Sequence, residues 1–176
     1  MLGHGAGGGV TARDLVAAAD VARSEGFSVA LVEQPYRVAG RRSPARAPQL
    51  DAAWVAVIDR LRARELKRLP IVVGGRSSGA RVACRTAEAT DAVGVLCLAF
   101  PLLPPRRGEP AQSRLPELDA VTVPTLVVQG DRDPFGIPPA GPRRTVVQVG
   151  GDHSLRSDLG GVAEAVRAWF ANLSTA

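Results

Sequence analysis

The chain has 176 residues, of which 45% are apolar, and it carries a formal net charge of +5 at pH 7. That apolar content can bury one substantial core, and no change in composition marks a boundary, so we expect a single domain over residues 1–176. No run of 18 or more apolar residues occurs, which excludes a membrane-spanning helix. The first residues show no signal-peptide pattern, so we expect a cytoplasmic protein.

The basic charge is nearly all arginine, since Lys67 is the only lysine. The arginines are spread along the chain, and the aromatic residues, 4% of the total, are not interleaved with them. Such a pattern lacks the stacking platforms that single-stranded nucleic acid needs, so a solvated surface is the favoured interpretation. We expect neither nucleic acid nor a membrane as a partner.

Helix and strand patterns alternate along the chain. Residues 11–26 predict a helix with Thr11 as its N-cap and Gly26 after its end. The next predicted elements are a strand over 27–33, a Pro- and Arg-rich loop over 34–49, an amphipathic helix over 50–68 and a strand over 71–74. After these come a helix over 80–89, a strand over 93–100, an irregular loop over 101–116, strands over 125–129 and 144–149, and a helix over 162–173. This alternation, with its continuous apolar strands, predicts a doubly wound, mostly parallel sheet of the α/β class.

Residues 75–79 read Gly-Arg-Ser-Ser-Gly and lie between a predicted strand and a predicted helix. A Gly-x-Ser-x-Gly pattern at such a turn holds the serine in a strained conformation that exposes its hydroxyl. We therefore predict Ser77 as a nucleophile. The alternative is an ordinary glycine-rich turn.

The chain has two histidines, His4 and His153, and His153 follows the predicted strand over 144–149. An imidazole there can act as the general base. Asp131 and Asp133 follow the strand over 125–129, and we favour Asp133 as the acid because a short turn can aim its carboxylate at His153. Asp131 remains the competing candidate. The chain order Ser, Asp, His is that of the α/β-hydrolase fold.

The glycine-rich run after His4 predicts an oxyanion loop. In such a loop the amides of Ala6 and Ser78 would bind the developing oxyanion. A flexible glycine-rich segment and a phosphate cradle are the alternatives, but no lysine follows at the spacing that a phosphate loop needs.

Six segments carry a resemblance to a known family, namely residues 2–7, 35–42, 74–81, 100–102, 124–130 and 133–136. On these segments the chain resembles a small α/β-hydrolase of the dienelactone-hydrolase-like group. More narrowly, it resembles a family of predicted hydrolases shared by bacteria and animals, one animal member of which is a subunit of a histone acetyltransferase complex. The resemblance implies a serine nucleophile, an Asp–His pair, a small acyl substrate and no cofactor. It also implies an alternative, a catalytically idle interaction module.

The predicted chemistry is acyl transfer to water from an ester, thioester or amide through Ser77, Asp133 and His153. An acyltransferase or haloperoxidase-like activity on the same residues is a further alternative. We place His4 and Arg76 beside the substrate. Arg76 departs from the small or aromatic residues common at this position in esterases, and it could pair with Glu33, with Asp91 or with a substrate carboxylate.

Cys84 and Cys97 fall on a predicted helix and a predicted buried strand, so we expect two unpaired core thiols. Neither has the spacing of a metal site, and we expect no metal.

An oxyanion loop of this kind should follow a central strand of roughly four to six apolar residues. Only Met1 and Leu2 precede Gly3 and His4. We therefore expect a minimal sheet that lacks its N-terminal strands, with either a gap at this position or a natural chain longer by roughly 20 to 40 residues.

Overall fold

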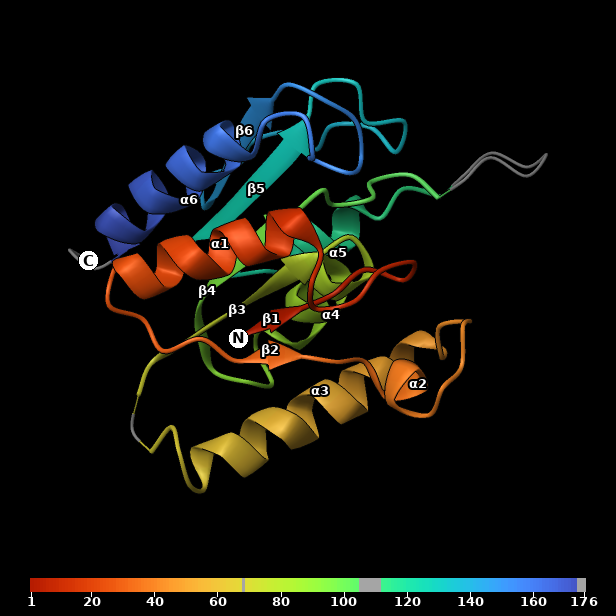
Figure 1. Ribbon diagram of the computed structural model, residues 1–176, viewed down its shortest axis with the longest axis vertical. Helices are drawn as coiled ribbons and strands as arrows, with labels where there is room; N and C mark the ends of the chain where they lie inside the picture. Colours follow the sequence, from red (N-terminus) through yellow and green to blue (C-terminus); the bar gives the residue numbers. More distant parts are fainter. Residues whose placement is uncertain (68, 105–111, 174–176) are drawn as a thin grey trace.

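Six parallel strands form one sheet in the order β2-β1-β3-β4-β5-β6. The structure is a computed structural model that describes residues 1–67, 69–104 and 112–173 (Figure 1). The strands are β1 (Leu2–Gly3), β2 (Leu31–Val32), β3 (Ile71–Arg76), β4 (Ala92–Leu98), β5 (Thr125–Gly130) and β6 (Arg144–Val149). The helices are α1 (Arg13–Ser24), α2 (Pro35–Val38), α3 (Ala47–Arg62), α4 (Ser78–Thr86), α5 (Leu115–Asp119) and α6 (Leu159–Leu173). The predicted doubly wound parallel sheet is confirmed.

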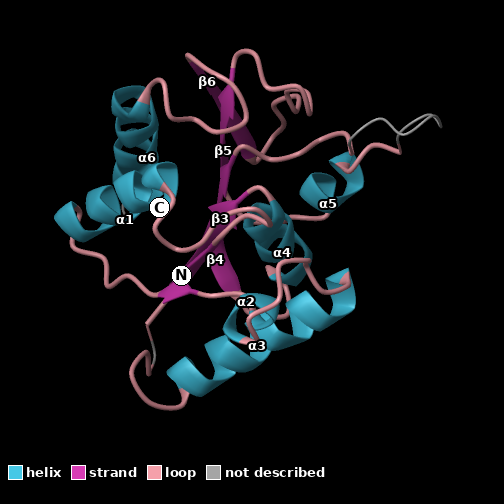
Figure 2. Cartoon of the chain, turned by 45° about the vertical axis from the view of Figure 1, so that its right-hand side comes forward, coloured by secondary structure: helices cyan, strands magenta, loops and turns pink. Residues whose placement is uncertain are grey.

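Helices cover both faces of the sheet, α1 and α6 on one side and α3, α4 and α5 on the other (Figure 2). Successive residues of a strand point to opposite faces. In β4, Leu96 and Leu98 therefore pack in the core beneath α1 and α6, while Val95 and Cys97 pack in the core beneath α3 and α4. This double burial explains why the middle strands are continuously apolar.

Several local predictions were wrong, and α3 ends at Arg62 although the sequence predicted a helix to residue 68. The N-cap of α1 is Ala12, with no side-chain cap, and not Thr11. The loop predicted over 34–49 contains α2, which begins with Pro35 in the first turn, and the loop predicted over 101–116 runs into α5, where Leu115 is the first residue. Residues 105–111 of that loop lie outside the described residues. A proline in the first turn is compatible with a helix, since no intrahelical bond is lost there.

Cys84 and Cys97 are both buried and unpaired, as predicted. Their sulfur atoms lie 3.5 Å apart, between α4 and β4. The contact with Cys84 and burial together raise the pKa of the Cys97 thiol well above its usual value, so this sulfur is held in its protonated, unreactive form.

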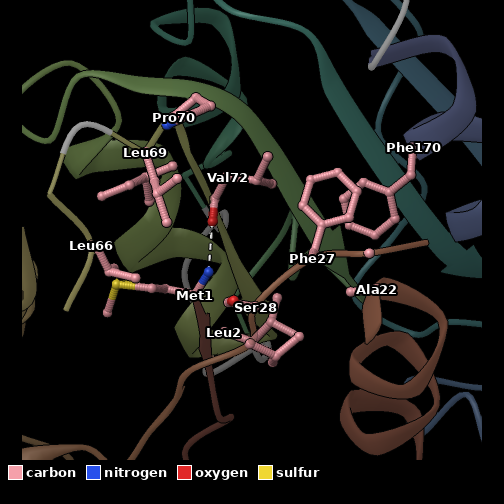
Figure 3. Close-up of a pocket in the computed structure, with 13 residues that line it drawn as sticks. Met1, Leu2, Ala22, Phe27, Ser28, Leu66, Leu69, Pro70, Val72 and Phe170 are labelled. Atoms are coloured by element: carbon pink, nitrogen blue, oxygen red, sulfur yellow. Dashed lines mark hydrogen bonds between the residues drawn. The ribbon is translucent and has the colours of Figure 1, made fainter. Parts of the chain in front are cut away.

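Two residues keep the sheet continuous where a gap was expected. β1 lies between β2 and β3, with Leu2 in register with Leu31 on one side and Gly74 on the other. The Met1 amino group donates a hydrogen bond of 2.7 Å to the Val72 carbonyl (Figure 3). The backbone groups of neighbouring strands therefore find partners although β1 is very short.

A pocket of about 270 Å³ lies at the amino ends of β1 and β3. Its walls are mostly apolar, and the rings of Phe27 and Phe170 face each other at one side of it, with centroids 4.4 Å apart (Figure 3). Ser77 and the other predicted catalytic residues follow the opposite, carboxyl ends of the strands, so this pocket is separate from the candidate site.

Candidate active site

Each predicted catalytic group follows the carboxyl end of a strand. Ser77 follows β3, Asp133 follows β5, His153 follows β6 and Ala6 follows β1. Because the strands are parallel, these ends lie along one edge of the sheet, where ligands bind in folds of this class.

Ser77 occupies a strained turn between β3 and α4. Its φ of 51° and ψ of −109° are unusual for a residue with a side chain. The turn is possible because glycines flank it closely. A Cβ on Gly75 or on Gly79 would lie 2.4 Å or 2.3 Å from the Gly3 carbonyl oxygen. The Gly-x-Ser-x-Gly spacing is therefore explained by the packing of this turn against β1.

The structure brings Ser77, His153 and Asp133 into one hydrogen-bonded chain. The Ser77 Oγ lies 3.0 Å from His153 Nε2, and His153 Nδ1 lies 2.8 Å from Asp133 Oδ2. A carboxylate can only accept hydrogen bonds, so the neutral imidazole carries its proton on Nδ1. Nε2 is then free to accept a hydrogen bond from the serine hydroxyl. The Asp133 side chain is fully buried, whereas that of His153 is partly accessible.

Asp133 is held by further donors that the sequence did not point to. The Gln129 side-chain amide donates to Asp133 Oδ2 at 2.8 Å, and the Phe135 amide donates to Oδ1 at 2.9 Å. Gln129 itself is fixed by contacts of its Nε2 with the Phe100 and Gly136 carbonyl oxygens. The Phe135 ring also packs edge-on against the His153 imidazole. Only the position of Gln129 near the end of the strand before Asp133 could have indicated its role.

Asp131, the competing acid, points elsewhere. Its Oδ1 accepts a hydrogen bond of 2.8 Å from the Gly151 amide, and it pairs with the exposed Arg132. These contacts brace the turn that carries His153 without touching the imidazole. The geometry thus favours Asp133 over Asp131.

His4 is completely buried, which does not fit the expectation that its side chain contacts substrate. The Gln34 amide donates to Nε2 at 2.9 Å, so Nε2 is unprotonated, and Nδ1 donates to the Gly5 carbonyl at 2.8 Å. Both ring nitrogens are occupied, and the imidazole is neutral. We correct the assignment accordingly, because His4 holds the start of the loop and has no accessible atom for a ligand.

The loop after His4 passes directly over Ser77. A Cβ on Gly5 would lie 3.3 Å from the Ser77 Cβ, and the Tyr36 hydroxyl donates to the Ala6 carbonyl at 3.0 Å. Within the described part of the chain, the Ala6 and Ser78 amides donate no hydrogen bond to protein. Ala6, Ser77 and Ser78 line one pocket of about 310 Å³.

Arg76 pairs with Asp14, a partner that was not predicted. Its Nε lies 2.8 Å from Asp14 Oδ2, and its Nη2 donates to the His153 carbonyl at 2.9 Å. The two expected partners are engaged elsewhere, Glu33 near Arg37 and Asp91 near Arg62. Arg76 therefore ties α1 to the loop of His153 and is not presented to a substrate.

Asp14 is itself buried, and this burial raises the pKa of its carboxyl group, although the Arg76 charge and the Leu15 amide oppose the rise. A raised pKa means that desolvation of the carboxylate outweighs its attraction to the guanidinium. The attraction between Arg76 and Asp14 therefore offsets only part of the cost of burying the Asp14 carboxylate. We interpret the ion pair as a contact that positions α1 against the loop of His153.

Among the described residues, no group of three or more His, Cys, Asp or Glu side chains could hold a metal ion. In the same part of the chain, no helix combines the length and apolar character needed to cross a bilayer.

A family model described as "Alpha/beta hydrolase domain" matches residues 1–158, so the chain belongs to the α/β-hydrolase family. No curated protein sequence matches the chain significantly.

Solved structures resemble the fold over nearly the whole chain. A serine hydrolase without a lid from Xanthomonas campestris is 19% identical with a TM-score of 0.75, covering 97% of this chain and 80% of that one. Est1E from Butyrivibrio proteoclasticus with ferulic acid bound is 18% identical with a TM-score of 0.75, covering 99% and 88%. An esterase from Pyrococcus furiosus is 14% identical with a TM-score of 0.74, covering 97% and 79%. At these identities the resemblance establishes the fold.

Proposed function

We propose that the protein is a cytoplasmic serine hydrolase of the carboxylic ester type that cleaves an ester or other acyl bond of a small substrate. The observation that carries the proposal is the chain of two hydrogen bonds, 3.0 Å and 2.8 Å long, from Ser77 through His153 to Asp133. Membership of the α/β-hydrolase family supports it. We also propose, from the sequence segments that resemble that family, that the protein belongs to the dienelactone-hydrolase-like group.

In the proposed mechanism the Ser77 oxygen attacks the acyl carbon while His153 Nε2 takes the hydroxyl proton. Asp133 stabilises the imidazolium and keeps its proton on Nδ1. The imidazolium then protonates the leaving group, and water repeats the sequence to release the acid and regenerate Ser77. The Ala6 and Ser78 amides stabilise the oxyanion, and a single donor of this kind typically contributes about 3 kcal/mol.

The test is labelling by a fluorophosphonate probe together with hydrolysis of p-nitrophenyl esters of increasing chain length. The wild type should be labelled and should turn over short esters. Ser77→Ala should lose both properties. Ser24→Ala, which removes a hydroxyl that donates to the Val21 carbonyl at the end of α1, should behave like the wild type.

A folded wild-type protein that is neither labelled nor active on any ester would contradict the proposal. That result would instead favour an idle interaction module. Products that carry the acyl group on an added alcohol or on peroxide would point to an acyltransferase or haloperoxidase-like activity on the same residues.

A further inference from the structure

Three arginines line one wall of the pocket that contains Ser77. Arg81 and Arg85 lie on α4 and Arg114 is the N-cap of α5; we call these three residues the arginine wall. Arg81 and Arg85 come four and eight residues after Ser77. At about 1.5 Å per helical residue, they stand about 6 Å and 12 Å along the helix from the serine.

Two carboxylates neutralise two of the three charges. Arg81 binds Glu117 through two nitrogens, one at 2.9 Å. Arg85 binds Asp51 at 2.8 Å and 2.6 Å and also contacts Glu117 at 3.3 Å. Such paired contacts fix the guanidinium planes and leave little capacity for a further anion.

Arg114 is the third arginine and carries the uncompensated charge. Its Nη1 donates to the Pro101 carbonyl at 3.1 Å, and in the described part of the chain no carboxylate forms an ion pair with it. Among the described residues, three guanidinium groups against two carboxylates leave one positive charge at the pocket. None of the described residues that line the pocket is Asp or Glu.

Burial and two neighbouring arginines act on the charge of Arg114. Its pKa is lowered, first by burial and then by the charges of Arg81 and Arg85, while Glu117 opposes this effect. An anion placed beside Arg114 would relieve this repulsion, so the pocket is better suited to a negative ligand than to a neutral one.

The remaining walls define which end of a substrate lies here. The pocket includes Ser77, Ala6 and Ser78, which would surround the acyl carbon, but His153, which must reach the leaving group, does not line it. Apolar side chains, among them Leu50 and Phe135, line the same pocket as the serine and the arginine wall. This pocket therefore receives the acyl side, and its volume of about 310 Å³ suits a short acyl chain.

We propose that the substrate is an ester whose short acyl chain ends in a carboxylate, and that Arg114 binds this carboxylate and determines specificity. The proposal rests on the proposed function for its chemistry. Ser77 would bond to the proximal acyl carbon, the ester C–O bond would break, and His153 would protonate the alcohol. Water would then release a dicarboxylic acid. A guanidinium binds a carboxylate in a bidentate manner, which provides the required geometric selectivity.

The experiment compares kcat/KM for p-nitrophenyl hydrogen glutarate with that for p-nitrophenyl valerate, which has the same acyl length without the charge. We expect the wild type to prefer the glutarate ester at least about tenfold, because hydrogen bonds to charged groups are strong. Arg114→Gln should lower kcat/KM for the glutarate ester by about 10- to 100-fold and that for the valerate ester by less than about threefold. Arg114→Lys should retain part of the preference.

Arg60→Gln, which removes one exposed positive charge from α3, is the matched control and should leave the ratio of the two substrates unchanged. A wild type without preference, or an Arg114→Gln variant in which both substrates lose activity equally, would overturn the proposal. Phosphate that inhibits hydrolysis of the glutarate ester as strongly as free glutarate does would show an unselective anion site. That result would also contradict the proposal.

Binding separates the two proposals. Glutarate should bind to the Ser77→Ala variant, measured by calorimetry, and binding should be lost when Arg114→Gln is added. If the wild type hydrolyses neither ester and resists the fluorophosphonate, but glutarate binding depends on Arg114, the hydrolase function fails while the carboxylate site stands. If esters are hydrolysed but glutarate does not bind, the function stands and the carboxylate site fails.

Discussion

The two halves of the candidate site rest on supports of very different length. Asp133 and His153 follow β5 and β6, which pair over six residues each. The loop of Ala6 follows β1, which has two residues in the sheet. The proposed base and acid thus follow strands with many backbone hydrogen bonds, whereas the proposed oxyanion loop follows a strand with few.

The short support is replaced by side-chain contacts and close packing. His4 is anchored to the Gln34 amide, Tyr36 to the Ala6 carbonyl, and the Gly3 carbonyl is packed against Gly79. We therefore expect substitutions that change the charge of Asp133 to lower activity without disturbing the fold. Substitutions that disturb the packing of the loop of Ala6 should lower both activity and stability. The predictions below test this difference.

The largest effect should come from Asp133→Asn. The amide would favour the wrong imidazole tautomer, so kcat should fall by about 10⁴-fold while the fold is retained. Combined with Ser77→Ala, it should add little, since the residues act as a unit. Ester hydrolysis and circular dichroism measure the two properties.

Asp131→Asn is the matched control, because the Asn oxygen can still accept from the Gly151 amide. Its kcat should stay within a fewfold of the wild type. A severe loss in Asp131→Asn with a mild one in Asp133→Asn would show that the acid has been assigned to the wrong residue.

Gly79→Ala should damage the oxyanion half through packing. Its Cβ would meet the Gly3 carbonyl oxygen at 2.3 Å, so the free energy of unfolding should fall by about 1–3 kcal/mol. The displaced loop should lower kcat by about 10²-fold. Chemical denaturation and ester hydrolysis provide the measurements.

Gly160 offers a matched control, since it is also the second residue of its helix and an added Cβ would have no heavy atom closer than 3.8 Å. Gly160→Ala should be neutral or stabilising by about 0.5–1 kcal/mol. Equal destabilisation by both alanines would argue against close packing of Gly79 on β1.

Asp14→Asn tests the contact that joins α1 to the loop of His153. Burial raises the pKa of Asp14 above its unfolded value, so the folded state binds its proton more tightly than the unfolded state. As the pH rises from about 4 through the raised pKa, the wild type should lose stability relative to Asp14→Asn, by at most about 1.4 kcal/mol per pH unit.

The measurement is the difference in unfolding free energy between the two proteins across this pH range. Should the wild type instead gain stability relative to the variant, the attraction of Arg76 would exceed the desolvation of Asp14, and the pKa would be depressed.

The smallest effect should come from Tyr36→Phe. Loss of the hydrogen bond to the Ala6 carbonyl should lower the free energy of unfolding by about 0.5–1.5 kcal/mol and kcat only a fewfold. Thermal unfolding and steady-state kinetics measure these changes. An unchanged kcat would mean that the other anchors suffice to hold the loop.

By itself, the sequence determined the central strands and the order of the candidate catalytic residues. The predicted strand over 144–149 coincides with β6, and those for β3 and β5 differ by two residues or fewer. β3 and β5 lie inside the sheet and are mostly buried on both faces, which explains their apolar sequence. β6 is the edge strand, and its Thr145 and Gln148 are exposed. The turn at Ser77 was readable because its flanking glycines are a local requirement of the chain.

Tertiary structure alone decided the partners of polar side chains and the shape of the edge of the sheet. Arg76 had several plausible carboxylates, and only the packing of α1 brings Asp14 to it. The buried His4 needs the backbone amide of Gln34, which follows β2, as its hydrogen-bond donor. β2 itself has only two of the seven residues that the sequence predicted for this strand. Such contacts join residues far apart in the chain, and neither composition nor periodicity carries information about which distant groups will meet.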